Sequence, residues 1–205
     1  MKRRKWALVL ALAVLAACYG WRLHIVNSAA EQIPLETYET GEWLDFGDGY
    51  IIDDALENLD GYFARVDGAK IMTPNEYLAE YGEGDGATVP DGDNRTVLAV
   101  TMTIKNEYNE DGGFEAYLWT AIPDTLNTEY RYDSALFDKA ESMGSVFKAS
   151  KGREVTRTFP FTRGEYAPYF TDSAGSVQGE VLDDSFHLNM TFRPVTRRFV
   201  FSLDE

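Results

Sequence analysis

Hydrophobic and polar residues alternate with a period of two along residues 95–105, and this is the clearest pattern in the chain. Leu98, Val100, Met102 and Ile104 occupy one face of the segment. A strand with a continuously apolar face is typical of the middle of a sheet, where that face packs on the core. The pattern therefore predicts a central strand.

Shorter runs with the same period predict that the rest of the fold is rich in β-structure. The further strands are expected at residues 61–71, 115–122, 154–161, 186–192 and 196–203. Gly68 predicts a bend in the first of these strands, and Pro123 ends the second. Pro160 indicates that the 154–161 strand ends at a sheet edge, because proline cannot donate a hydrogen bond to a neighbouring strand.

A helix signal interrupts the strands after residue 72. Thr73 is the expected N-cap, Pro74 suits the first helical position, and Glu76 completes a capping box. The helix is expected to end at Gly82. A second, short helix is expected around residues 134–138.

Turn-forming residues separate these elements. Gly47-Asp48-Gly49 predicts a turn, and residues 83–94 and 106–113 form polar loops. Many short strands joined by turns predict an antiparallel β-sandwich with one or two short helices, rather than a parallel sheet. We expect this domain to cover residues 46–205.

The N-terminal residues carry an export signal. Residues 2–5 are basic, residues 6–17 form an uncharged apolar run, and small residues precede Cys18. Cleavage before Cys18 (signal peptide 1–17) and lipidation of its thiol would make a bacterial lipoprotein. Each buried lipid methylene contributes about 0.8 kcal/mol, so two or more chains give stable anchoring.

An uncleaved signal anchor is the alternative, because the apolar run continues to about residue 26. Trp6 to Trp21 spans 16 residues, fewer than the roughly 20 that cross the hydrocarbon core, and snorkelling of Arg22 would extend the span. Both anchors keep the basic residues inside, so the domain faces the extracytoplasmic side of the cell membrane. Residues 18–45 are expected to form a juxtamembrane stem.

Composition limits the classes of function. Cys18 is the only cysteine, so the exported part has no disulfide, thiolate metal site or cysteine nucleophile. Residues 31–129 contain 23 acidic and four basic residues, whereas residues 130–205 contain 11 acidic and 10 basic residues. This charge argues against nucleic acid binding, which needs lysine and arginine. The acidic half either keeps the protein soluble or docks a cationic peptide, a basic partner or divalent ions.

No catalytic constellation is visible in the sequence. His24 and His187 are the only histidines, and neither a zinc-binding motif nor a nucleophile elbow accompanies them. The acidic pairs are Asp53-Asp54, Asp91 with Asp93, Glu110-Asp111 and Asp183-Asp184. Such pairs arise freely in an acidic chain, so we expect a protein that is not an enzyme. An envelope hydrolase that uses paired carboxylates is the alternative.

Two acidic, glycine-rich loops are candidates for binding calcium, a hard cation that prefers oxygen ligands. The candidate ligands are Asp85, Asp91, Asp93, Asn109 and Asp111. Neither loop follows the EF-hand register, because Leu118 stands where the last ligand, a glutamate, is required when Gly112 is the sixth residue. Solvated turns are the alternative.

Aromatic residues suggest another binding surface. Tyr166, Tyr169 and Phe170 lie in a turn-rich segment, where exposed aromatic residues usually need a partner. The partner would be an envelope protein or a glycan. Aromatic residues in the predicted strands line either a groove or, more commonly, the core; these are Tyr117, Trp119, Phe159 and Phe161.

Four segments carry a resemblance to a known family. They are Trp21–Asn27, Gly61–Leu78, Val97–Asn106 and Phe192–Arg198. Together they resemble the DUF5028 family of membrane-anchored proteins from Gram-positive bacteria and, more loosely, the immunoglobulin-like extracellular domain DUF4352. The similarity spans most of the chain. It implies an exported, membrane-tethered, immunoglobulin-like β-sandwich and brings no catalytic residues with it.

The expected function is therefore that of a binding or structural module of the bacterial cell envelope. The membrane is reached through an N-terminal lipid or helix, and no cofactor is expected apart from the candidate calcium. One alternative is a surface sensor or assembly subunit that docks a protein partner through the acidic half of the chain. The carboxylate-dependent hydrolase remains an alternative from a different class.

Overall fold

The computed structural model divides the chain into two units, Met1–Ile33 and Pro34–Glu205. It describes residues 2–29, 33–52, 57–82, 88–89, 95–110, 114–115, 118–124, 129–141, 146–147, 149–163 and 185–204. The elements are α1 (Lys2–Ala29), β1 (Leu35–Glu39), β2 (Leu44–Asp45), β3 (Tyr62–Met72), α2 (Pro74–Tyr81), β4 (Val97–Asn106), β5 (Phe114–Glu115), β6 (Thr120–Pro123), β7 (Tyr130–Tyr132), α3 (Ser134–Glu141), β8 (Val146–Phe147), β9 (Arg153–Arg163), β10 (Ser185–Thr191) and β11 (Thr196–Ser202).

The first unit contains a single long helix, α1. Its apolar residues do not gather on one face, and large side chains such as Trp6 and Trp21 are exposed. Cys18 is also exposed, and the helix continues through it without a break. In the part of the chain that the structure describes, no helix combines the length and the apolar character needed to cross a membrane.

Nine strands of the second unit form one mixed sheet in the order β1-β11-β10-β6-β7-β9-β4-β3-β2. Neighbouring strands are antiparallel, except for β1 and β11, which run parallel. The two remaining strands, β5 and β8, pair in a small separate sheet. β4 lies between β3 and β9 and pairs with both along its whole length, which confirms the predicted central strand.

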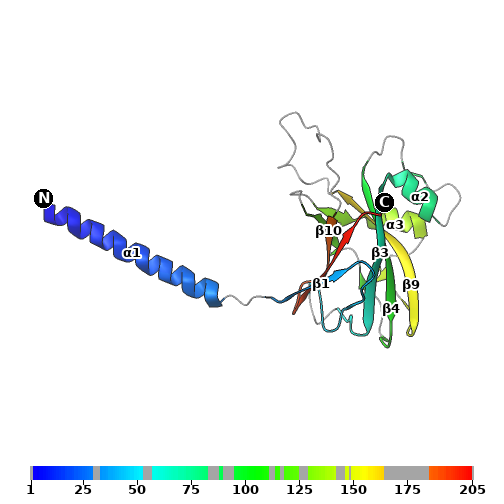
Figure 1. Ribbon diagram of the computed structural model, residues 1–205, viewed down its shortest axis with the longest axis horizontal. Coiled ribbons are helices and arrows are strands. Elements are labelled where there is room, and N and C mark those ends of the chain that lie inside the picture. Colours follow the sequence, from blue (N-terminus) through cyan, green and yellow to red (C-terminus); the bar gives the residue numbers. More distant parts are fainter. Residues whose placement is uncertain are drawn as a thin grey trace. The chain divides into compact units, whose positions relative to one another are not determined.

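The large sheet curls until its two ends nearly meet, so the second unit approaches a closed barrel (Figure 1). Hydrogen bonds join the two ends. After β11, the backbone N–H of Asp204 donates to the carbonyl of Ala69 on β3 at 2.8 Å. Before β3, Tyr50 forms an isolated bridge with Arg193, in the turn between β10 and β11.

This architecture confirms the mainly β prediction and corrects the predicted arrangement of the strands. An immunoglobulin-like sandwich consists of two packed sheets, whereas the long strands here belong to one sheet that curls back on itself. Strand β3 contains a register shift between Val66 and Gly68, and such a bulge bends a strand and increases its twist. The sequence marked the bend at Gly68, but the pattern of one strand does not reveal which edges the bend brings together.

Apolar side chains fill the interior of the barrel. The fully buried face of β4 is the one that the alternation predicted, and it consists of Leu98, Val100, Met102 and Ile104. Trp119, Phe159 and Phe161 join the same cluster, and the rings of Trp119 and Phe159 meet edge to face with centroids 5.4 Å apart. These three aromatic residues therefore belong to the core and not to a binding groove.

The helices α2 and α3 pack on the opposite face of β4, where Val97 and Ala99 belong to a second apolar cluster. α2 begins with the predicted capping box: the Glu76 N–H donates to Thr73 Oγ1, and the Thr73 N–H donates to Glu76 Oε2. The Tyr77 hydroxyl donates to the carbonyl of Thr158 on β9 at 2.6 Å, and burial raises the pKa of Tyr77. Both predicted helices are confirmed.

Pro160 lies inside β9, between β4 and β7, rather than at a sheet edge. Its carbonyl accepts a hydrogen bond from the N–H of Asp133 at 2.9 Å. The nitrogen and the carbonyl of one strand residue point to the same side, so the missing N–H of Pro160 faces the start of α3. The ladder with β7 ends one residue away, at the pair Phe161 and Tyr132. No sheet hydrogen bond is therefore lost, and the proline is tolerated in an internal strand.

Two further segments differ from their predicted structure. The expected strand 115–122 is divided, because β5 ends at Glu115 and β6 begins at Thr120. Strands β1 and β2 lie in the segment 18–45 that was expected to be a stem. The folded unit therefore begins earlier than residue 46.

Candidate functional site

A pocket of about 430 Å³ opens between the segment that follows β2 and the turn that joins β10 to β11. Its lining consists of Gly47, Asp48, Gly49, Tyr50, Glu57, Asn58, Leu59, Asp60 and Pro194. Three of these nine residues are acidic and none is basic. Carboxylates in a concave site concentrate negative potential and attract a cation.

The turn Gly47-Asp48-Gly49, which the composition predicted as a turn, forms one wall of the pocket. Gly47 has a φ of +51°, in the left-handed region that favours glycine, and the Gly49 N–H donates to the Phe46 carbonyl at 2.8 Å. A Cβ atom on Gly49 would lie 2.7 Å from the Phe46 oxygen and from Thr191 Cγ2, so only glycine fits. The turn leaves the side chain of Asp48 exposed at the pocket.

Backbone and hydroxyl groups hold the other two carboxylates. Glu57 accepts hydrogen bonds from the N–H groups of Ile51 and Ile52, at 2.8 Å and 2.7 Å. Asp60 accepts one from the Tyr108 hydroxyl at 2.7 Å. Both carboxylates are thus oriented before any ligand arrives, which lowers the entropic cost of binding.

The pKa of the Tyr108 hydroxyl depends on the negative charge around the pocket. The hydrogen bond to Asp60 is the main reason that the pKa of Tyr108 is raised, and the negative charges of Asp45 and Glu107 add to the effect. A phenol surrounded by carboxylates resists becoming an anion. The same field favours a positive group at this position.

A pair of buried asparagines fixes the backbone on which Asp60 stands. Asn109 Nδ2 donates to the carbonyls of Asn58 and Asp60, at 3.1 Å and 2.7 Å. Asn106 Nδ2 donates to the Asn109 carbonyl, and Asn106 Oδ1 accepts from the Asn109 N–H, at 2.9 Å and 2.8 Å. The polar residues at the end of β4 therefore position the pocket.

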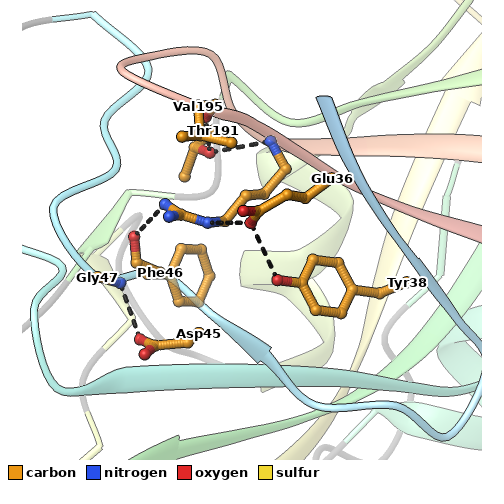
Figure 2. Close-up of polar contacts among 8 residues, drawn as sticks. Glu36, Tyr38, Asp45, Phe46, Gly47, Thr191 and Val195 are labelled. Carbon is orange, nitrogen blue, oxygen red and sulfur yellow. Dashed lines mark hydrogen bonds and ion pairs between the residues drawn. The ribbon is translucent and has the colours of Figure 1, made fainter. Parts of the chain in front are cut away.

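Arg197 forms hydrogen bonds with residues of three segments, and Figure 2 labels its partners Glu36, Phe46 and Thr191. Its Nε donates to Glu36 Oε2 on β1 at 2.9 Å, and its Nη1 donates to the Phe46 carbonyl, after β2, at 2.9 Å. Its backbone N–H donates to Thr191 Oγ1 on β10 at 3.2 Å. Only 13% of the side chain is exposed, so the guanidinium is a nearly buried charge that depends on these partners.

Three residues with large exposed side chains are bonded to the lining of the pocket. Ile52, Tyr108 and Phe192 are 61%, 51% and 39% exposed. Each is hydrogen bonded to a residue of the lining: Ile52 to Glu57, Tyr108 to Asp60, and Phe192 through its N–H to the carbonyl of Tyr50. These three residues are therefore bonded to the lining, although none of them is part of it.

Of the five calcium candidates, Asn109 alone is among the residues that the structure describes. Asp85, Asp91, Asp93 and Asp111 lie outside the described residues. Asn109 is buried, and its amide nitrogen holds the 58–60 backbone. The described part of the chain contains no group of three or more histidine, cysteine or acidic residues arranged to hold a metal ion.

The other candidate residues fall in different places. The aromatic candidates Tyr166, Tyr169 and Phe170 lie outside the described residues, and so do most members of the acidic pairs. Glu110 forms an ion pair with Lys151 at 2.7 Å, which lowers the pKa of Glu110. His187 on β10 pairs at 2.5 Å with Asp124, the residue that follows β6. Cys18 lies on α1.

Glu57, Asp60 and Arg197 were not singled out from the sequence. The one local signal was the turn at residues 47–49, which marked the position of Asp48 but not its role. The remaining lining residues reach Pro194 only because the sheet curls and brings the two ends of the barrel together. A pattern along one strand carries no information about that closure.

A sequence profile matches residues 35–197, and its family is described as a domain of unknown function, DUF5028. The matched span begins at the first residue of β1 and ends at Arg197, so it includes the whole lining of the pocket. No curated protein and no solved structure matches the chain.

Proposed function

Since this chain belongs to the DUF5028 family, whose description names no activity, we propose a function from its pocket: a binding module of the bacterial cell envelope that receives a cationic group. The module is exported and tethered to the membrane at its N-terminus. Its barrel faces the extracytoplasmic side.

One observation carries the proposal: among the residues that the structure describes, three carboxylates and no basic residue line a pocket of about 430 Å³. Ligand pockets commonly have volumes of about 300 to 1,000 Å³, so the cavity suits a side chain or a small head group. Glu57 and Asp60 are already oriented by hydrogen bonds. A bound cation would therefore replace repulsion among fixed negative charges with attraction.

Exposed apolar side chains on residues that are bonded to the lining favour a protein as the source of the cation. A lysine or arginine that enters the pocket brings neighbouring residues against Ile52, Tyr108 and Phe192, which are exposed. Aromatic residues and an apolar surface next to a charged pocket are common features of protein interfaces. This observation supports the narrower alternative of a sensor or assembly subunit that docks a basic segment of an envelope protein.

The tether rests on the N-terminal sequence. Residues 2–5 are basic, residues 6–17 are apolar, and Cys18 follows two alanines. This order is typical of an export signal. A lipid on Cys18 would keep the barrel at the membrane.

The binding proposal is tested with a fluorescein-labelled peptide of alternating lysine and leucine, titrated by fluorescence anisotropy against the full-length protein in neutral detergent. The control peptide replaces every lysine with glutamine. We expect the lysine peptide alone to bind, and to bind more weakly as salt is added, because salt screens partly exposed charges. Equal binding of both peptides would contradict a cation site.

Charge-removing variants locate the site. Asp48→Asn and Asp60→Asn are each expected to weaken binding by about two- to fivefold, the range of a single partly exposed ion pair. The matched control is Asp138→Asn, an exposed carboxylate on α3 that is not part of the lining. If Asp138→Asn weakened binding as much as the pocket variants, general attraction to an acidic protein would explain the result.

A further inference from the structure

Arg197 occupies a position from which it controls the shape of the pocket. Its Nη1 donates to the Phe46 carbonyl, and the same carbonyl accepts the Gly49 N–H of the turn wall. A Cβ atom on Gly49 would lie 3.0 Å from Arg197 Nη1, so the guanidinium packs directly behind this wall. Gly47 and Gly49 both line the pocket, although Arg197 itself does not.

Glu36 orients this guanidinium from β1. The Glu36 carboxylate accepts a hydrogen bond from Arg197 Nε at 2.9 Å and another from the Tyr38 hydroxyl at 3.1 Å (Figure 2). Without Glu36, the nearly buried cation would lose its paired carboxylate, and an uncompensated buried charge is strongly unfavourable. The side chain would then turn toward solvent and release the Phe46 carbonyl.

β1 is the least embedded strand of the large sheet. Among the described strands it pairs only with β11, and four of its five residues are exposed. It is also the first element of the second unit, beginning two positions after Ile33 in the chain. Along the chain, β1 is therefore the first strand after the N-terminal segment.

We propose that Arg197 is a positioning residue for the pocket, and that the pairing of β1 with β11 sets its position through Glu36. Docking of β1 holds the turn wall in place, and release of β1 loosens it. The state of the N-terminal segment thereby regulates binding. This inference rests on the proposed function for its meaning, but its structural part is measurable without any ligand.

Hydrogen–deuterium exchange of the full-length protein tests the coupling. Glu36→Gln and Arg197→Lys are expected to speed exchange in the segment 46–52 by about three- to tenfold, as expected for the loss of a hydrogen bond that holds a turn. Exchange in β4 and β9 should not change. Glu39→Gln, on the same strand but without a bond to Arg197, is the matched control and should exchange like the wild type.

Two results would overturn the inference: unchanged exchange in segment 46–52 in both variants, or an equal increase in β4 and β9, which indicates global destabilisation. The lysine–leucine peptide separates this failure from failure of the proposed function. If wild type and Glu36→Gln bind it equally well, the positioning role is wrong and the binding function stands. If neither protein binds the peptide but exchange in segment 46–52 is faster in the variants, the coupling stands and the proposed cation site is wrong.

Discussion

At the scale of single residues, buried polar groups define the part of the barrel that carries the pocket. Asn106 is 1% exposed, and its amide bonds three backbone groups: the carbonyls of Asn109 and Ala149 and the N–H of Asn109. A buried backbone group that loses its partner costs about 1–3 kcal/mol. One side chain thus stabilises two segments that lie far apart in the sequence.

Asn106→Ala should therefore lower the free energy of unfolding by about 2–4 kcal/mol, as three backbone groups lose one shared partner. Urea unfolding followed by tryptophan fluorescence measures the change. Asn189→Ala, on the partly exposed strand β10, is the control and should cost less than about 1 kcal/mol. An Asn106 variant as stable as this control would show that the network does not stabilise the barrel.

Two glycines distinguish steric from backbone effects. Gly49→Ala is expected to cost about 1–3 kcal/mol through overpacking against Phe46 and Thr191, and to weaken peptide binding because the turn wall moves. Gly41→Ala meets no atom within 4 Å but has a φ of +87°, so only backbone strain of about 1–2 kcal/mol is expected. Gly41→Ala should bind the peptide like the wild type. If this variant lost peptide binding, binding would not depend on the geometry of the pocket.

At the scale of elements, sequence patterns correctly predicted the features that depend on interactions between residues close together in the chain. The capping box and Gly82 gave the bounds of α2, because a helix end must satisfy its own backbone groups. The alternation in residues 95–105 gave the buried face of β4. The bend at Gly68 coincides with the bulge in β3. For these elements the sequence contained enough information.

The elements that were missed depend on distant partners. β1 and β2 are short, and they are strands only because β11 and β3 pair with them. Pro160 suggested an edge, but its missing donor faces α3 instead of a strand. The choice of one curled sheet over two packed sheets also depends on which edges meet. The pocket could not be predicted for the same reason, since Pro194 and Asp60 come together only when the sheet curls into a barrel.

The capping box of α2 makes stability depend on pH. Hydrogen bonds from Thr73 lower the pKa of Glu76, so the ionised form stabilises the folded state. This contribution is present above the ordinary glutamate pKa of about 4.5 and is lost as the pH falls through the lower folded-state value. Unfolding of wild type and Glu76→Gln across the acidic range should therefore differ at neutral pH and converge in acid.

Thr73→Ala removes the other side chain of the same capping box. Loss of the N-cap should cost about 1 kcal/mol at neutral pH, and it should remove much of the pH-dependent difference that Glu76 produces. If the stability difference between wild type and Glu76→Gln persisted unchanged in the Thr73→Ala background, the capping box would not be its source.

At the scale of the whole molecule, part of the uneven distribution of charge along the chain can be assigned to the pocket. The acidic excess of residues 31–129 was compatible with solubility alone, but three of these carboxylates line one pocket. The pocket lies within the unit that begins at Pro34, whereas the export signal that we propose lies in residues 1–17. Binding and tethering are therefore assigned to separate parts of the chain.

The lipid form of the tether depends on one thiol. In a bacterial host that processes lipoproteins, Cys18→Ser should abolish labelling with palmitate and leave an unprocessed precursor. The wild-type chain is the control. Unchanged size and membrane retention of the variant, with an unlabelled wild type, would contradict lipidation and leave the N-terminal segment itself as the anchor.

The central claim is that the acidic pocket receives a cationic group, and a zero-length cross-link tests it most directly. A carbodiimide joins the amine of a bound lysine to a carboxylate in contact with it, and mass spectrometry identifies the carboxylate. With the lysine–leucine peptide, the account predicts cross-links concentrated on Asp48, Glu57 and Asp60, and their loss when salt is raised. Cross-links spread evenly over exposed carboxylates such as Glu80 and Asp138 would contradict it.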